Sequence, residues 1–136
     1  DLDVRSSELT GITVGGEIIA NIIDEIPILA VAASVAEGET IIQDAAELRF
    51  KETDRISAMM NGLTTLGARI EEREDGLVIA GGSSLTGGTV ESFNDHRIAM
   101  AMGVAGLMAS GDVRVEGANA AAVSFPTFWD VLQELG

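Results

Sequence analysis

Two dense polar motifs interrupt an otherwise apolar chain: KETDR at residues 51–55 and NDHR at residues 94–97. Both stand where a strand or loop is expected to lead into a helix, and Asp24 stands at a third junction of this kind. Helix N-termini present free N–H groups and the positive end of the helix dipole, so they attract anions. The two motifs and Asp24 are therefore the first candidates for a functional site.

The residue types at these junctions suit proton transfer on an anionic substrate. Arginines such as Arg55 and Arg97 bind carboxylate or phosphate groups bidentately. Lys51, among them, would stay charged or act as a base. The carboxylates Asp24 and Glu52 could exchange protons with a reacting carbon or hydroxyl group.

Taken singly, each candidate also has a structural explanation. Asp24 suits a helix N-cap. His96 has no companion metal ligands and suits a structural role. KETDR alone equally suits an ion-pair cluster at a helix start. What favours a binding site is the occurrence of three such junctions in a chain with only 8 Lys and Arg against 22 Asp and Glu.

The overall composition restricts the class of protein. The 136 residues suit one domain, and the net charge of −14 repels a phosphate backbone, which argues against nucleic acid as a partner. No uninterrupted apolar run approaches the ~20 residues of a membrane span, and no secretory leader is visible, so we expect a soluble protein. The absence of cysteine excludes disulfides and thiolate metal sites and fits the cytoplasm. The chain begins at Asp1 rather than Met, which suggests a piece of a longer polypeptide.

An internal repeat organises the chain. An offset of 73 residues superposes Gly38 on Gly111, and an offset of 69 superposes Gly67 on Gly136, each within a matching run of apolar residues. Copies of one supersecondary unit usually stack, because neither buries its apolar face alone. We therefore predict two repeats, at about residues 12–80 and about residues 85–136.

Hydrophobic period and turn residues predict the order β-α-β-α-β-β for the repeated unit. In repeat one we expect strands at 16–22, 39–45, 68–74 and 76–81, and helices from near Asp24 to Gly38 and from Thr53 to Leu66, with a hairpin turn at Asp75-Gly76. In repeat two we expect strands at 89–93 and 112–117 and helices at 97–111 and 126–135. The fold class is α/β, a mixed α+β sandwich with helices on one face of mixed sheets.

Three stretches carry a resemblance to a known family: IDEIPILAVAASVAEGETIIQDAAELRFKETDR, NDHRIAMAMGVAGL and VSFPTFWDVLQELG. They resemble the C-terminal part of the 3-phosphoshikimate 1-carboxyvinyltransferases, the EPSP synthases of the shikimate pathway. The resemblance implies two domains, each of three βαβαββ units arranged as an inside-out barrel, with the active site between them. This chain would be roughly the last third, with the missing N-terminal part of the same enzyme as its partner.

The resemblance also implies a reaction, the transfer of the enolpyruvyl group of phosphoenolpyruvate to the 5-hydroxyl of shikimate 3-phosphate, without metal or cofactor. Asp24 resembles the acceptor of the hydroxyl proton, and Glu52 resembles the group that exchanges a proton with the methylene carbon. Lys51 resembles the lysine on shikimate 3-phosphate. Arg55 and Arg97 resemble the arginines on phosphoenolpyruvate, with His96 beside them. We therefore expect these side chains to line one face.

Two positions depart from the family pattern. Val123 stands where many members have a lysine on phosphoenolpyruvate, and Glu47 stands where some place an asparagine on the other substrate. Two other functions stay open. One is a UDP-N-acetylglucosamine enolpyruvyl transferase, against which the two polar motifs argue. The other is an anion-binding or scaffold module without catalysis, whose charged junctions are only caps and ion pairs.

Overall fold

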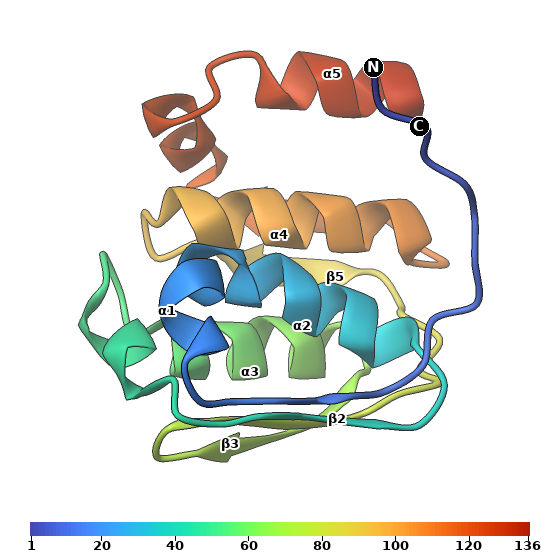
Figure 1. The fold of residues 1–136 in the computed structure, drawn as a ribbon. Helices are drawn as coiled ribbons and strands as arrows, with labels where there is room; N and C mark the ends of the chain where they lie inside the picture. Colours follow the sequence, from blue (N-terminus) through green and yellow to red (C-terminus); the bar gives the residue numbers. More distant parts are fainter.

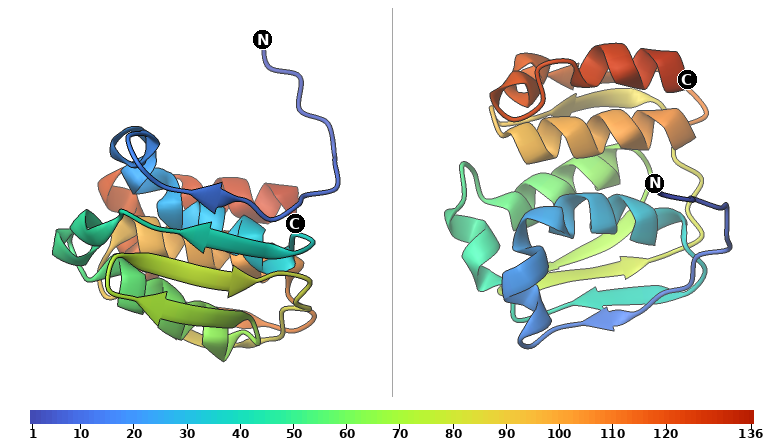
Figure 2. Two further views of the ribbon diagram at one scale, coloured as in Figure 1. Left: turned by 60° about the horizontal axis from the view of Figure 1, so that its bottom comes forward. Right: turned by 45° about the horizontal axis from the view of Figure 1, so that its top comes forward.

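A four-stranded mixed sheet lies in the segment predicted as the first repeat (Figures 1 and 2). The computed structural model describes all 136 residues. The strands of this sheet, in the spatial order β1-β2-β4-β3, are β1 (Thr13–Val14), β2 (Glu39–Ile42), β3 (Arg69–Arg73) and β4 (Gly76–Ala80). β1 pairs parallel with β2, whereas β4 pairs antiparallel with both β2 and β3.

Helices lie between this sheet and a second, smaller one (Figure 2). The smaller sheet consists of the parallel strands β5 (Gly88–Glu91) and β6 (Val113–Glu116). The helices between the sheets are α2 (Ile26–Val35), α3 (Arg55–Thr65) and α4 (His96–Met108). Their small residues permit close packing: a Cβ on Gly62 of α3 would lie only 2.7 Å from the sulfur of Met102 in α4. The expected mixed α/β class is confirmed.

The expected strand at residues 16–22 is wrong. The chain turns at Gly16, which has a φ of 72°, directly after β1. Residues Ile18–Ile22 then form helix α1, which is followed by the 3₁₀ helix η1 (Ile23–Glu25). Ile19, Ile23 and Ile26 are four and three residues apart and all are buried, which is the spacing of one helical face. The buried residues of this apolar run therefore follow a helical period and not the alternation of a strand.

The helical run Ile18–Val35 is long and apolar enough to span a membrane by length and composition alone. A core helix of a soluble protein passes the same test, and 44% of this run is buried inside the protein. Asp24 and Glu25 also interrupt it, and charged groups at the centre of a bilayer are costly. Its packing on α4, α3 and β4 accounts for the apolar composition.

The hairpin of β3 and β4 turns one residue earlier than predicted. Arg73 pairs with Gly76, so Glu74 and Asp75 form the turn and Gly76 belongs to β4. A Cβ on Gly76 would collide with the carbonyl oxygen of Ile42 in β2. Glycine is required here by the close approach of a neighbouring strand and not by the turn.

The other elements are shorter than the sequence predicts. β2 ends at Ile42 because Asp44, with φ of 60°, turns the chain away from the sheet. Two 3₁₀ helices were not predicted, η2 (Ala46–Phe50) and η3 (Ala118–Val123), and the last helix, α5 (Phe128–Leu135), begins two residues later than expected. η2 leads directly into the KETDR motif.

Candidate active site

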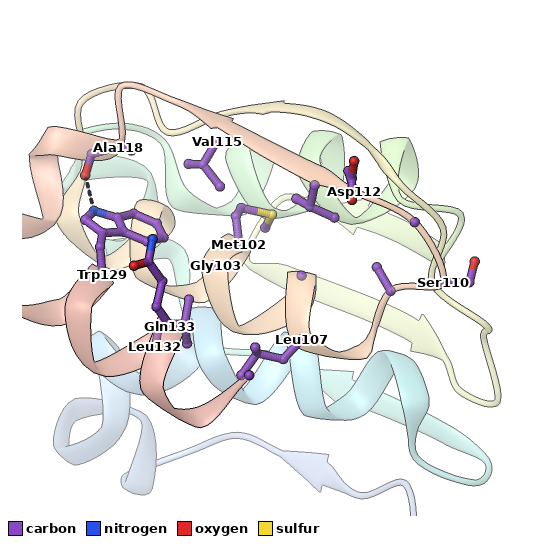
Figure 3. A pocket seen from close by; sticks show the side chains of 15 residues that line it. Met102, Gly103, Leu107, Ser110, Asp112, Val115, Ala118, Trp129, Leu132 and Gln133 are labelled. Carbon is purple, nitrogen blue, oxygen red and sulfur yellow. Dashed lines mark hydrogen bonds between the residues drawn. The ribbon is translucent and has the colours of Figure 1, made fainter.

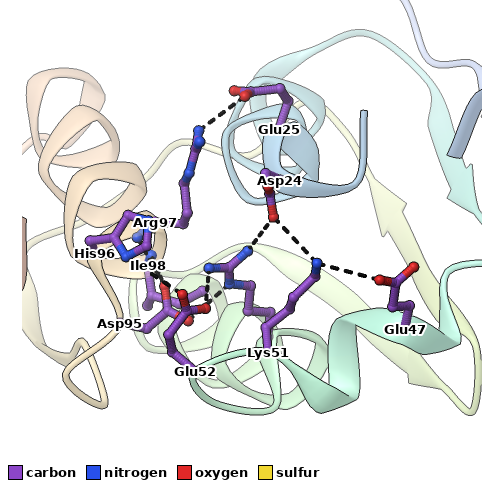
Figure 4. A network of polar contacts seen from close by, with 10 residues as sticks. Asp24, Glu25, Glu47, Lys51, Glu52, Asp95, His96, Arg97 and Ile98 are labelled. Atoms are coloured by element: carbon purple, nitrogen blue, oxygen red, sulfur yellow. Dashed lines mark hydrogen bonds and ion pairs between the residues drawn. The ribbon is translucent and has the colours of Figure 1, made fainter. Parts of the chain in front are cut away.

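Three helix-entry junctions meet at one end of α2, α3 and α4 (Figure 4). Asp24 lies in η1 before α2, Lys51 and Glu52 lie in the loop between η2 and α3, and His96 and Arg97 begin α4. Arg55 is the first residue of α3 and lies in the middle of the group. The structure therefore brings all six predicted site residues together, although they come from both predicted repeats.

Arg55 is the centre of the cluster. Its side chain is 2% exposed, and it donates from Nη1 to Asp24 at 2.9 Å and from Nη2 to Glu52 at 2.7 Å. A third bond runs from Nε to Asp95 at 2.8 Å. Burial lowers the pKa of Arg55, but the hydrogen bond and charge of Asp95 and the charge of Glu52 outweigh it, so the pKa is raised. The guanidinium thus stays charged and holds three carboxylates in place.

Asp95 is a site residue that the sequence analysis did not single out. It is completely buried, and its Oδ1 accepts from the backbone N–H groups of Arg97 at 2.9 Å and Ile98 at 3.3 Å, which caps α4. Its Oδ2 accepts the Nε bond of Arg55. One carboxylate therefore joins the start of α4 to the start of α3. Its place directly before the helix in NDHR is the signal that could have revealed the cap.

Lys51 lies between two carboxylates, with Nζ 3.7 Å from Asp24 and 3.5 Å from Glu47. Burial raises the pKa of Asp24, but the hydrogen bond from Arg55 and the positive charges of Lys51, Arg55 and Arg97 outweigh it, so the pKa is lowered. Asp24 is therefore an ionised carboxylate at neutral pH. A bound anion that neutralised these cations would raise its pKa again and make it a stronger base.

Glu52 is half exposed, whereas Arg97 is partly buried. The side chain of Glu52 is 51% exposed, and its Oε1 lies 4.0 Å from Nδ1 of His96. Arg97 donates from Nη1 to Glu25 at 3.0 Å, whereas its buried Nε has no hydrogen-bond partner. Beside Arg97 is a cavity of about 170 Å³ between α2 and α4, which Asp24 also lines. The charged residues in its lining are Asp24, Glu25 and Arg97.

The sequence model of the family EPSP synthase (3-phosphoshikimate 1-carboxyvinyltransferase) matches residues 1–132. The chain belongs to this family. A 3-phosphoshikimate 1-carboxyvinyltransferase of Salinibacter ruber is 58% identical over 136 residues, which are 99% of this chain and 32% of the relative. One from Bacillus cereus is 51% identical over 135 residues, 99% of this chain and 32% of the relative. The chain thus spans about a third of the length of the curated relatives it matches.

Solved structures agree with this membership. An EPSP synthase from Acinetobacter baumannii is 42% identical with a TM-score of 0.89, covering 95% of this chain and 31% of that one. The enolpyruvyl transferase NikO from Streptomyces tendae is 21% identical with a TM-score of 0.69, covering 95% of this chain and 28% of that one, and shows likeness of fold alone.

No group of three or more His, Cys, Asp or Glu side chains is placed to hold a metal ion.

A second polar network fixes the loop that carries Lys51 and Glu52. Arg49, in η2, donates to Asp54 and Glu72 at 2.8 Å each and to the carbonyl oxygens of Arg73 and Glu74. Asp54 also caps α3 by accepting from the N–H of Ser57 at 3.1 Å. The residues on both sides of Lys51 and Glu52 are therefore anchored to α3 and to the β3-β4 hairpin.

The Arg49 network predicts a loss of stability in acid. The hydrogen bonds of Ser57 and Arg49 lower the pKa of Glu72. Burial raises the pKa of Asp54, but the Ser57 N–H and Arg49 outweigh it and the pKa is lowered. Ionised Asp54 and Glu72 therefore stabilise the folded chain fully at pH values above their ordinary pKa values, 3.8 for Asp54 and 4.5 for Glu72. This stabilisation is lost as the pH falls through their lowered pKa values in the folded state.

Urea unfolding at several pH values between about 6 and about 2 measures this effect. We expect the free energy of unfolding to fall more steeply below about pH 4.5 in the unaltered chain than in Arg49→Met, which has lost the shared cation. Parallel pH profiles for the two proteins would show that the network does not depress these pKa values.

Proposed function

We propose that this chain forms one wall of the active site of a 3-phosphoshikimate 1-carboxyvinyltransferase, with phosphoenolpyruvate and shikimate 3-phosphate as substrates. The observation that carries the proposal is the convergence of Lys51, Arg55 and Arg97 with Asp24 and Glu52 at three helix entries. Cations at helix N-termini suit phosphate and carboxylate groups. The rest of the site comes from the part of the enzyme outside this chain.

The assigned roles follow from position and charge. Glu52, half exposed, delivers a proton to the methylene carbon of phosphoenolpyruvate, which creates positive charge at the adjacent carbon. The 5-hydroxyl oxygen attacks that carbon while Asp24 takes the hydroxyl proton. Loss of phosphate, with return of one proton from the new methyl group to Glu52, then restores the double bond. The proposal assigns every step to side chains, calls for no cofactor, and places the reaction in the cytoplasm.

Substrate binding must rearrange the ion pairs of the cluster. Asp95 is completely buried and keeps its bond to Arg55, whereas the side chains of Asp24 and Glu52 are about half exposed and can turn toward a ligand. Lys51, which faces Asp24, is assigned to shikimate 3-phosphate. Arg97, with its unpartnered Nε, is assigned to phosphoenolpyruvate together with Arg55, and His96 lies beside them.

A second candidate, a charged cluster without catalysis, draws on a different observation. Lys51, Arg55 and Arg97 are all already paired with carboxylates of the protein. Such a cluster could serve only to hold the three helix entries together. Isothermal titration of phosphoenolpyruvate and shikimate 3-phosphate into the complete enzyme and into its Arg97→Met variant separates the two functions, because the loss of Arg97 leaves both affinities unchanged if the cluster is purely structural.

The isolated chain should show no measurable enolpyruvyl transfer, because a site closed on one side only leaves the reacting groups in water. Transfer should appear in a chimera in which this chain replaces the matching third of the Salinibacter ruber relative. The activity of the isolated chain and that of the chimera are both measured as the release of phosphate from the two substrates. Turnover by the isolated chain, or a folded chimera that binds neither substrate, would refute the proposal.

A further inference from the structure

A cavity of about 650 Å³ lies outside the candidate active site, between α4, β6 and α5 (Figure 3). Asp112 is its only charged lining residue. Nε1 of Trp129 already donates to the carbonyl oxygen of Ala118 at 2.8 Å. None of the six predicted site residues lines this cavity, so it does not hold them in place.

The loop of residues 51–53, which carries Lys51 and Glu52, has no backbone hydrogen bonds. It lies between η2 and α3, in neither helix nor strand. None of its N–H or C=O groups is paired with another group of the chain. A segment without backbone pairing of its own keeps its position only if its two ends are held.

Arg49 and Asp54 hold the two ends of this loop together. Nη1 of Arg49 donates to Oδ2 of Asp54 at 2.8 Å, which closes the chain around residues 50–53. Asp54 is itself fixed, because its Oδ1 accepts from the N–H of Ser57 in α3 at 3.1 Å. Phe50 is 84% exposed, so packing of its ring does not hold the loop. The pair of Arg49 and Asp54 therefore sets the distance between the ends of the loop.

The turn of the β3-β4 hairpin holds Arg49. The carbonyl oxygens of Arg73 and Glu74 accept from Nη2 at 2.6 Å and from Nε at 2.7 Å. The carboxylate of Glu72 accepts from Nη1 at 2.8 Å. The hydrogen bonds of Glu72 and Asp54 raise the pKa of Arg49, so the guanidinium stays charged. Its position thus follows that of the hairpin turn.

The same turn also holds the segment before η2. The side chain of Asp75 accepts from the N–H of Asp44, and the carbonyl oxygen of Asp75 accepts from the N–H of Ala45, at 2.8 Å each. The turn is therefore bonded to the chain just before η2 and, through Arg49, to the last turn of η2. It determines where the chain enters the loop of residues 51–53.

We propose that Arg49 is a positioning residue of the reaction, which places Lys51 and Glu52 against the substrates by joining their loop to the turn of the β3-β4 hairpin. Arg49 itself lies outside the group of side chains assigned to the substrates. The inference rests on the proposed function, in which Lys51 binds shikimate 3-phosphate and Glu52 transfers a proton. Misplacement of a reacting group by about 1 Å can cost ~10²-fold in rate, so an anchor outside the site can control turnover.

A double-mutant cycle in the Salinibacter ruber chimera tests this inference. Arg49→Met should lower the turnover number by at least about tenfold, because Glu52 is no longer held in place. In a chimera that already carries Glu52→Gln, Arg49→Met should lower the turnover number by less than about twofold, because the group that Arg49 positions no longer transfers a proton. Isothermal titration should also show weaker binding of shikimate 3-phosphate to Arg49→Met, through displacement of Lys51.

Two further variants separate positioning from stability. Arg73→Met is the matched control, because Arg73 is a half-exposed arginine of the same hairpin whose side chain contacts Glu71 at 3.7 Å and not the loop. It should leave turnover and affinity unchanged. Arg49→Lys keeps the charge but cannot form all the bonds of the planar guanidinium, so it should recover thermal stability more than turnover.

Kinetic assays well below the thermal midpoint of each variant decide the outcome. Near-normal turnover and affinity in Arg49→Met, or equal effects of Arg49→Met with and without Glu52→Gln, would overturn the inference and leave the proposed function intact. If Glu52→Gln alone leaves turnover unchanged, the proposed proton transfer fails, and the affinity for shikimate 3-phosphate decides whether Arg49 places Lys51. A chimera that binds neither substrate would refute the proposed function and this inference with it.

Discussion

Replacing Glu52 by glutamine in the Salinibacter ruber chimera is expected to lower the turnover number by ~10²–10⁴-fold, the range of general acid-base catalysis. Glutamine keeps the size of the side chain and an oxygen that accepts the bond from Nη2 of Arg55, at 2.7 Å in this structure. It removes the titrating oxygen. Affinity for the two substrates should change little, because Lys51, Arg55 and Arg97 carry the binding.

Steady-state kinetics and thermal melting of Glu52→Gln together show whether Glu52 transfers protons or only stabilises the fold. Glu71→Gln is the matched control, since Glu71 is an exposed glutamate on β3 outside the candidate site. If Glu52 is only an ion-pair partner at a partly exposed position, its replacement costs about 0–1 kcal/mol of stability. Near-normal turnover with a lowered melting midpoint would remove Glu52 from the mechanism.

The class of fold and most of its elements were predictable because they depend on local patterns. The hairpin at Glu74 and Asp75 was found within one residue, since a turn signal separates two β-rich runs. Helix α1 was missed because Ile18, Ile19 and Ile22 are β-branched and give no polar face to a short element. The helix is favoured because it buries Ile19 and Ile23 in the core, which local sequence does not reveal.

The candidate site was predictable as a set of residues but not as an arrangement. Motifs at expected helix entries predicted Lys51, Glu52, Arg55 and Arg97 as candidates, because the tendency of such ends to bind anions is a local property. That Arg55 is buried among three carboxylates depends on contacts between residues up to 40 positions apart. Likewise, the anchoring role of Arg49 depends on the β3-β4 hairpin, and no motif marks it.

Asp95→Ala is expected to lower the free energy of unfolding of this chain by about 3–5 kcal/mol, the cost of leaving one partner of a buried ion pair without the other. Asp95 is completely buried, and its loss removes the 2.8 Å bond to Arg55 as well as the cap of α4. The change also leaves a buried guanidinium with only the half-exposed carboxylates of Asp24 and Glu52.

Two further variants separate the ion pair from the cap. Asp54→Ala removes the cap of α3, where the carboxylate is 37% exposed and its partner Arg49 keeps Glu72, so we expect a loss of about 0.5–2 kcal/mol. Asp95→Asn retains a good capping group and loses only the charge, so its effect should fall between the two. Urea unfolding of the three variants measures the differences. If Asp95→Ala costs no more than Asp54→Ala, the buried pair of Asp95 and Arg55 does not hold α3 and α4 together, and the cap alone explains why an aspartate precedes His96.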